Sequence, residues 1–388
     1  MPDGREPATI RLVERIAEIE AETWDAVAGA DNPSVSHAFL AALEESGSAC
    51  GETGWLPRHL VMEDEAGRLI AAAPMYLKGH SYGEYVFDHG WADAYERAGG
   101  RYYPKLQVAV PFTPVTGPRL LLHPAAPAGT RAALIAGMLE MARRLGVSSL
   151  HITFPTAEEC HALAAAGLLQ REGEQFHWRN PGYASFEDFL AALSSRKRKN
   201  IRKERAAALA GGIEILTLSG AAIEERHWDA FFRFYRNTGD RKWGHPYLTR
   251  DFFTRLGAGM ADKVVLVMAE KRGRLVAGAL NLRGRTTLYG RNWGSDGDYP
   301  FLHFECCYYR AIDFAIRHGL ARVEAGAQGP HKIQRGYLPE PTYSAHWLRD
   351  PGFAKAVGDY LKRERQAVAQ EREELALLSP FRKEPDRA

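Results

Sequence analysis

Short apolar segments separated by a polar turn occur in two similar places along the chain. Residues 62–73 read MEDEAGRLIAAA and residues 268–279 read MAEKRGRLVAGA, and six positions are identical at a constant offset of 206. In both segments an apolar run precedes a polar turn that contains glycine, and a second apolar run follows. This pattern predicts a strand, a tight turn and a second strand, which together form a hairpin.

Two amphipathic helices are predicted downstream of these hairpins. Residues 138–152 and 311–323 have apolar positions at helical spacing, and each segment reaches a glycine, Gly146 or Gly319, before a short apolar strand. Glycine is the expected residue directly after a last helical turn, because it adopts a left-handed backbone without steric cost. The order hairpin, helix, strand therefore occurs twice, and we expect two α/β domains of related fold.

The repeat sets the expected domain boundaries. We place the first domain at residues 1–178, the second at 179–350, and a C-terminal helix and tail at 351–388, with the turn sequence Asn180-Pro181-Gly182 at the junction. The first copy carries about 33 extra residues, which we assign to an insertion at about 80–118. The C-terminal helix has mixed charge. It either closes the fold or forms the dimer seam of an oligomer, and the sequence does not decide between these two alternatives.

The insertion is rich in aromatic and histidine residues. A long segment without secondary structure is unusual in a compact domain unless it binds a ligand. We therefore take Tyr85, Trp91 and Asp93 as candidate substrate-binding residues in an aromatic-lined pocket. The alternative is an extended hairpin that packs on the partner domain.

Composition and charge exclude several classes of protein. The 388 residues include 50 Lys and Arg against 48 Asp and Glu, so no overall field attracts nucleic acid, and a polyanion needs a local basic cluster. The four cysteines have no CxxC spacing, so we expect reduced thiols, no disulfide framework and no metal site. The N-terminus lacks the apolar core of a signal peptide, and no run of about 20 apolar residues occurs. These features predict a cytoplasmic protein without a transmembrane segment.

A strongly basic helix is predicted at the start of the second domain. Residues 196–205 read RKRKNIRKER, in which seven cations accompany a single carboxylate. Clustered Arg and Lys bind phosphate through charge-assisted hydrogen bonds. The polar side chains that we take as candidate substrate-binding residues are Arg196, Lys199, Asn200, Arg202 and Lys203. The partner could be tRNA, a lipid or nucleotide diphosphate, or a membrane surface, and a merely solvated basic face is the alternative.

Three segments resemble the GNAT superfamily of N-acyltransferases, and within it the FemAB-like branch. The segments are SSRKRKNIRKE at 194–204, YPFL at 299–302 and EAGAQGPHK at 324–332. The best-known members of this branch transfer amino acids from aminoacyl-tRNA to peptidoglycan precursors, and they contain two GNAT units in tandem. The resemblance implies a mixed α/β (α+β) fold of two GNAT-like domains, each a mostly antiparallel mixed sheet flanked by helices.

The resemblance also implies where the chemistry takes place. In a GNAT fold the acyl group and the acceptor amine meet beside the helix that begins near Pro300, next to the strand at 286–293. Amine acylation needs a base, and we take His303 or Glu305 for this role. We take Lys332 as the residue that binds an anionic group or the developing oxyanion. Further expected substrate-binding residues are Tyr289, Asn292, Trp293 and Arg335.

Each of these residues also has a structural alternative. Glu305 could complement the dipole of its helix, His303 could cap or pack, and Lys332 could be a surface loop residue. In the same helix we expect Cys307 to belong to the core, and we do not expect Cys306 to act as a nucleophile.

One departure from the GNAT pattern bears on the donor. GNAT acetyltransferases usually hold the coenzyme A pyrophosphate in a [QR]-x-x-G-x-[GA] loop, and this chain has none. Asp296 and Asp298 stand at the equivalent place and would repel a pyrophosphate. Fem-type ligases also lack the loop, so its absence favours that branch over plain acetyl transfer.

The resulting hypothesis is direct attack of an amine acceptor on an activated ester or thioester. The acceptor is a small molecule or a peptide, aminoacyl-tRNA or acyl-CoA is the co-substrate, and no cofactor is tightly bound. One alternative is a non-catalytic binding or regulatory protein for a phosphorylated cell-wall precursor or nucleotide. Another is a conventional acyl-CoA N-acetyltransferase with a divergent cofactor loop.

Overall fold

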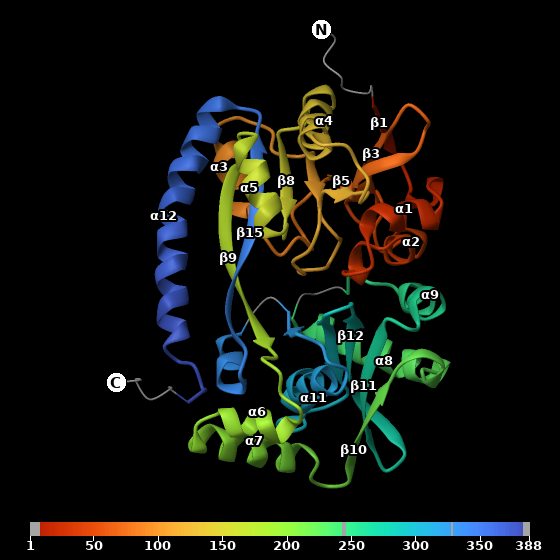
Figure 1. Cartoon of the computed structure of the whole chain (residues 1–388), viewed down its shortest axis with the longest axis vertical. Helices are drawn as coiled ribbons and strands as arrows, with labels where there is room; N and C mark the ends of the chain where they lie inside the picture. The colour runs from red at the N-terminus through yellow and green to blue at the C-terminus, as the bar shows by residue number, and fades with distance from the viewer. Residues whose placement is uncertain (1–7, 243–245, 327–328, 383–388) are drawn as a thin grey trace. The chain divides into compact units, whose positions relative to one another are not determined.

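The chain forms two compact units. The computed structural model describes residues 8–242, 246–326 and 329–382 (Figure 1). Unit 1 consists of the residues up to Gly173 together with Pro341–Val368, and unit 2 consists of Glu174–Glu340 and the residues from Ala369 onward. This division differs from the boundaries that we expected at 178 and 350, because the chain returns to unit 1 after residue 340.

Unit 1 contains four strands paired in the order β1-β3-β4-β7 and five paired in the order β15-β8-β6-β5-β2. Neighbouring strands are antiparallel except for the parallel pair β6–β8. The strands are β1 (Thr9–Val13), β2 (Trp55–Pro57), β3 (His59–Glu63), β4 (Leu69–Ala73), β5 (Met75–Lys78), β6 (Lys105–Val108), β7 (Leu121–Leu122), β8 (Ser149–Thr153) and β15 (Leu338–Leu348). The helices are α1 (Ala21–Ala28), α2 (His37–Glu45), α3 (His89–Arg97), α4 (Thr130–Arg144), α5 (Ala157–Ala165) and α12 (Pro351–Ala376). One face of α4 buries Leu134 and Met138 against Leu60, Leu106 and Leu150 of the strands.

Unit 2 is built on six strands in the order β10-β11-β12-β13-β14-β9. The pair β13–β14 is parallel and the other pairs are antiparallel. The strands are β9 (Leu169–Arg179), β10 (Ile213–Leu218), β11 (Val264–Lys271), β12 (Arg274–Arg283), β13 (Thr287–Ser295) and β14 (Arg322–Glu324). The helices are α6 (Phe186–Ala192), α7 (Ser195–Ala208), α8 (Glu225–Lys242), α9 (Arg250–Met260), α10 (Leu302–Phe304) and α11 (Arg310–Arg317). Helix α8 packs closely on β13, since a Cβ added at Gly294 would lie 2.2 Å from the carbonyl oxygen of Phe234.

The predicted internal repeat is confirmed. Strands β3 and β4 form one hairpin and β11 and β12 the other, and the turn glycines Gly67 and Gly273 both have a φ of 75°. In each unit a helix, α4 or α11, then leads through a glycine of positive φ, Gly146 or Gly319, into a strand that pairs in parallel with an earlier one. The expected α/β architecture of mostly antiparallel mixed sheets flanked by helices is therefore correct.

The aromatic-rich insertion of unit 1 is neither structureless nor an extended hairpin. It contains helix α3 and strand β6. Helix α12 closes over this region, because Val357 and Leu361 pack in one buried cluster with Trp91 and Tyr102. None of the helices in the described part of the chain combines the length and the apolar character needed to cross a membrane.

Candidate functional site

The parallel strand pair β13–β14 separates partway along its length. The two strands pair at Thr287–Arg322, Leu288–Val323 and Tyr289–Glu324, and β13 then continues to Ser295 while β14 ends. A strand without a neighbour on one side presents unpaired backbone N–H and C=O groups on that edge. The separation of the strands therefore opens a space lined by polar backbone.

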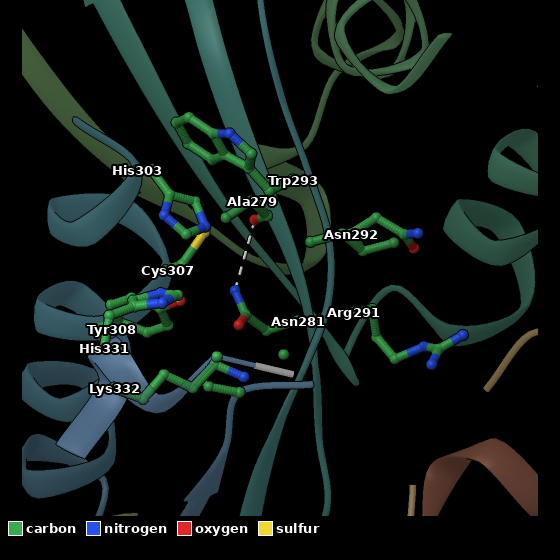
Figure 2. Close-up of a pocket in the computed structure, with 14 residues that line it drawn as sticks. Ala279, Asn281, Arg291, Asn292, Trp293, His303, Cys307, Tyr308, His331 and Lys332 are labelled. Atoms are coloured by element: carbon green, nitrogen blue, oxygen red, sulfur yellow. Dashed lines mark hydrogen bonds between the residues drawn. The ribbon is translucent and has the colours of Figure 1, made fainter. Parts of the chain in front are cut away.

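A β-bulge reshapes β13 at the same place. The register against β12 passes from Asn281–Gly290 to Leu280–Asn292, so Arg291 is the extra residue. Such a bulge bends the strand and redirects its side chains, and bulges are frequent beside active sites. The buried Asn281 amide stabilises this region by donating to the carbonyl oxygen of Val265 at 3.2 Å. It also donates to that of Ala279 at 3.4 Å (Figure 2).

The helix that we predicted from Pro300 onward is irregular. Phe301 has a φ of 62°, α10 begins at Leu302, and a π-helical segment covers Glu305–Tyr309 before α11. A π-helical turn contains an extra residue and changes the direction of the side chains that precede and follow it. Here the irregular part of the helix carries His303, Cys307 and Tyr308 beside the separated strands.

A cavity of about 400 Å³ lies where β13, the irregular helix and the segment after β14 meet (Figure 2). Its lining includes four of the residues that the sequence predicted for the site: Asn292, Trp293, His303 and Lys332. The other lining residues are Ala279, Leu280, Asn281, Gly290, Arg291, Cys307, Tyr308, Ala325, Gly329 and His331. His331 and Tyr308 were not predicted from the sequence: His331 lies in the segment at 324–332, of which only Lys332 was taken as a site residue, and no motif marks Tyr308.

Lys332 is a buried cation at the cavity. Its side chain is 2% exposed, and its Nζ donates to the carbonyl oxygen of Gly326 at 2.9 Å. Burial lowers the pKa of Lys332 to about 8. Residues Ala327 and Gln328 of the same glycine-rich loop lie outside the described residues. Lys332 can therefore present a positive charge in a dry environment, where it acts strongly on a developing anion.

His303 lies within a group of aromatic rings. Its ring centroid is 5.3 Å from that of Trp293 and 5.2 Å from that of Tyr308, with the rings at steep angles. Tyr308 Oη and His331 Nε2 are 3.0 Å apart and form a hydrogen bond. Figure 2 shows His303 next to Trp293, and Tyr308 next to His331. The cavity thus contains imidazole and ammonium groups, which can move a proton and stabilise a negative charge.

The structure does not support Glu305 as a base. Its side chain is fully buried and does not line the cavity. It accepts hydrogen bonds from Arg205 Nε at 2.9 Å, from Arg205 Nη2 at 3.0 Å and from Arg310 Nε at 2.7 Å. Both carboxylate oxygens are thus engaged by guanidinium groups, which leaves no oxygen directed at a substrate. Glu305 instead ties α7 to the π-helical segment.

Arg335 and Tyr289 also lie outside the cavity lining. The Arg335 guanidinium lies 3.5 Å from the centroid of the Phe304 ring and donates to Glu204 Oε1 at 2.8 Å. Tyr289 is buried at the last position where β13 pairs with β14, and burial raises its pKa to about 12. Their predicted role in substrate binding therefore stays a prediction, since neither residue lines the cavity.

The basic helix and the aromatic insertion are not part of this cavity. The five predicted residues of α7 (Arg196, Lys199, Asn200, Arg202 and Lys203) are exposed. In unit 1, Trp91 is a buried residue whose ring packs on His346 at 4.9 Å, while Asp93 is exposed on α3. Tyr85 is half-buried in the same insertion. Trp91 packs in a buried cluster with Tyr102, and the aromatic pocket that we predicted around it stays a prediction.

The two adjacent cysteines are unsuited to nucleophilic catalysis. Cys306 is buried in the core, and Cys307 lines the cavity although we expected it only in the core. Burial raises the pKa of both thiols, so neither forms the reactive thiolate at neutral pH. Within residues 8–242, 246–326 and 329–382, no group of three or more His, Cys, Asp or Glu side chains is arranged to hold a metal ion.

The repeated α/β units and the separated parallel strands define the fold as a tandem GNAT-like fold. The chain belongs to the FemAB-like family, described as peptidoglycan biosynthesis/recognition, whose sequence profile matches residues 15–383. No curated protein matches the chain.

Solved structures show the same fold at low sequence identity. The chain is similar to the C-terminal domain of a proposed lysylphosphatidylglycerol synthetase from Agrobacterium fabrum, with a TM-score of 0.54, 13% identity and coverage of 89% of this chain and 96% of that one. It is also similar to FemX, with a TM-score of 0.54, 12% identity and coverage of 88% and 98%. L-PGS from Bacillus licheniformis has a TM-score of 0.51, 12% identity and coverage of 83% and 95%. At these identities the comparison establishes the fold alone.

Proposed function

We propose that this protein is an N-acyltransferase that moves an aminoacyl or acyl group from an activated ester or thioester to an amine acceptor by direct attack. The observation that carries the proposal is the cavity at the separated strands, which brings His303 and Lys332 together. His303 accepts a proton from the attacking amine, and Lys332 stabilises the oxyanion of the tetrahedral intermediate or an anionic group of a substrate. When the intermediate collapses, the bond from the carbonyl carbon to the donor oxygen or sulfur breaks, and the leaving alcohol or thiol takes up the proton from His303. Because both Cys306 and Cys307 remain protonated thiols, the proposal includes no covalent acyl-enzyme.

The segment before α10 supports an aminoacyl ester over a coenzyme A thioester as the donor. Asp296 accepts a hydrogen bond from the Tyr299 hydroxyl at 2.9 Å and pairs with Arg274 at 3.1 Å, and Asp298 is exposed. The Asp296 carboxylate is thus already paired, whereas the exposed carboxylate of Asp298 opposes the binding of a pyrophosphate at this position. Membership of the FemAB-like family supports the same choice, with a peptidoglycan precursor as the class of acceptor.

A transfer assay with two donor classes tests the proposal. The full chain is incubated with labelled aminoacyl-tRNA or labelled acyl-CoA, together with peptide amines of the cell-wall precursor type, and the products are identified by mass spectrometry. We expect transfer from aminoacyl-tRNA. Transfer from acyl-CoA alone would identify a conventional acetyltransferase. Saturable binding of a nucleotide-linked precursor without transfer from either donor would overturn the catalytic proposal in favour of a binding protein.

The transfer rate should fall as the pH rises through about 8. This is the pKa to which burial lowers Lys332, and the ammonium form is the one that stabilises negative charge. In the variant Lys332→Arg the fall should move to higher pH, because a guanidinium stays charged. A pH profile measured with one acceptor for both proteins checks this, since deprotonation of the acceptor amine affects both equally. Identical profiles would contradict the role of Lys332.

The lowered pKa of Lys332 also predicts how the free energy of unfolding depends on pH, which can be measured without a substrate. Lys332 has a pKa of about 8 in the folded chain, lowered from 10.5, so the unfolded chain binds more protons between these values. The free energy of unfolding should therefore rise with pH across this window, relative to Lys332→Met, by on the order of 3 kcal/mol. Urea titrations at the two ends of the window measure the difference. A constant difference would show that Lys332 titrates normally.

A further inference from the structure

Helix α7 carries an unneutralised basic face. The 14-residue helix spans about 21 Å. Five of its cations have no ion-pair or hydrogen-bond partner among the residues that the structure describes: Arg196, Lys197, Arg198, Lys199 and Lys203. Arg202 pairs with Glu187 of α6. In Figure 1, α7 runs beside α6 along the lower edge of unit 2.

The one carboxylate of α7 does not offset this charge, because it is turned inward. Glu204 accepts hydrogen bonds from Tyr309 and Arg335, and the neighbouring Arg205 binds the buried Glu305. Glu204 and Arg205 are therefore balanced by inward partners. Three cations that share the exposed side of the helix are not balanced in this way: Arg196, Lys199 and Lys203. Like charges at helical spacing repel one another unless an anionic partner is present. This outer face is available for a partner of opposite charge.

Exposed leucines lie beside the start of the same helix. Leu377 is 82% exposed and Leu378 is 52% exposed, directly after α12. They are not part of a frayed end, because Leu375 before them and Phe381 after them both pack against the core of unit 2. Moving two adjacent, largely exposed leucines from water into an apolar environment lowers their free energy.

Backbone contacts fix the leucines next to α7. The amide of Ser194 donates to the carbonyl oxygen of Pro380 at 3.0 Å, and the amide of Arg382 donates to that of Ala192 at 3.0 Å. Leu378 lies two residues before Pro380, hence within roughly 8 Å of it. Ser194 precedes the first cations of α7 by two residues. The basic face and the apolar pair are thus neighbours on the surface of unit 2.

We propose that α7 together with Leu377 and Leu378 forms a docking surface for an anionic lipid bilayer. A basic helix beside exposed aliphatic residues combines attraction to anionic headgroups with insertion of apolar side chains at the acyl boundary. Single-stranded nucleic acid would use the cations as well, but it stacks its bases on aromatic side chains instead of leucines. The exposed leucines therefore favour a membrane. This surface lies outside the cavity, and the inference does not depend on the proposed transfer reaction.

Sedimentation with vesicles tests this surface without any acyl donor. We expect the full chain to bind vesicles of phosphatidylcholine mixed with phosphatidylglycerol, and not vesicles of phosphatidylcholine alone. Replacing three cations of the exposed face, in Arg196→Gln/Lys199→Gln/Lys203→Gln, should weaken binding about 100-fold, since each cation near an anionic surface contributes about fivefold. The variant Leu377→Ser/Leu378→Ser should weaken it by at least about 10-fold.

A charge-matched control separates this surface from a general effect of charge. Arg226→Gln/Arg255→Gln/Lys263→Gln removes three exposed cations elsewhere in unit 2, each of which already has a carboxylate partner. Binding should be unchanged in this control. Absence of binding to the anionic vesicles, an equal loss in the control, or full binding by the leucine variant would overturn the proposal. Binding of tRNA through α7 by a chain that ignores the vesicles would identify a nucleic-acid surface instead.

Discussion

Replacing Lys332 by Met should reduce the rate of acyl transfer by about 100-fold or more while leaving the fold intact. This is the loss that follows when one preorganised group is removed from an oxyanion site. Lys332 is 2% exposed at the cavity, so its charge acts in a poorly screened environment. Met has a similar length and no charge. The buried site should accept it, because burial already disfavours the ammonium form of Lys332.

The measurement compares kcat and KM with a matched control. Lys263→Met makes the same chemical change at an exposed position of unit 2 and should retain full activity. Lys332→Arg should retain part of the activity at neutral pH if charge is the essential property. Equal rates for Lys332→Met and Lys263→Met would show that Lys332 has no role in the reaction. A loss confined to KM would assign it to substrate binding alone.

Replacing Lys105 by Met should destabilise unit 1 by about 3–5 kcal/mol, the cost of breaking a buried ion pair. The Lys105 ammonium is fully buried and donates to Ser81 Oγ at 2.8 Å, to Glu84 Oε2 at 2.8 Å and to Asp88 Oδ2. Without this cation, the buried carboxylates of Glu84 and Asp88 keep only one buried ammonium nearby in the described part of the chain, that of Lys78, whose Nζ lies 3.8 Å from Glu84 Oε1. Burial already disfavours negative charge in this cluster, because it raises the pKa of Glu84 to about 7 even with Lys105 present.

An exposed ion pair provides the matched control for Lys105. Lys355 pairs with Asp359 on α12 at 2.9 Å with a largely exposed side chain, so Lys355→Met should cost less than about 1 kcal/mol. The melting temperature of Lys105→Met should fall by on the order of 10 °C. Restoring neutrality with Lys105→Met/Glu84→Gln, which leaves the Lys78 ammonium with the Asp88 carboxylate, should recover part of the loss. A Lys105→Met protein as stable as Lys355→Met would show that the cluster does not hold unit 1 together.

Much of the fold was predictable because its signals are local. The two hairpins depend on apolar runs around Gly67 and Gly273, and a left-handed turn there follows from the residue type. The glycines that end α4 and α11 have the same physical origin. The predicted basic helix corresponds to α7 and the predicted C-terminal helix to α12. Each of these features is determined by residues only a few positions apart.

The site was only partly predictable because its groups meet across long sequence separations. Asn292, Trp293, His303 and Lys332 do line one cavity. Glu305 is a carboxylate at the position where the sequence predicts a base, yet the guanidinium groups of Arg205 and Arg310 pair with both of its oxygens. One of them, Arg205, lies 100 positions away in the sequence. No local pattern distinguishes a free carboxylate from one that is paired in this way.

The sequence by itself determined the repeat and its turns, the basic helix α7, the mixed-charge helix α12, and the absence of a strong overall charge. Only the tertiary structure decided that β15 and most of α12 return to unit 1, and that Trp91 belongs to the core. It also decided that Lys105 is buried among carboxylates, whereas five cations of α7 have no partner among the residues that the structure describes. The reason is physical. Backbone preference depends on neighbours along the chain, whereas burial and charge pairing depend on which distant segments the folded chain brings into contact.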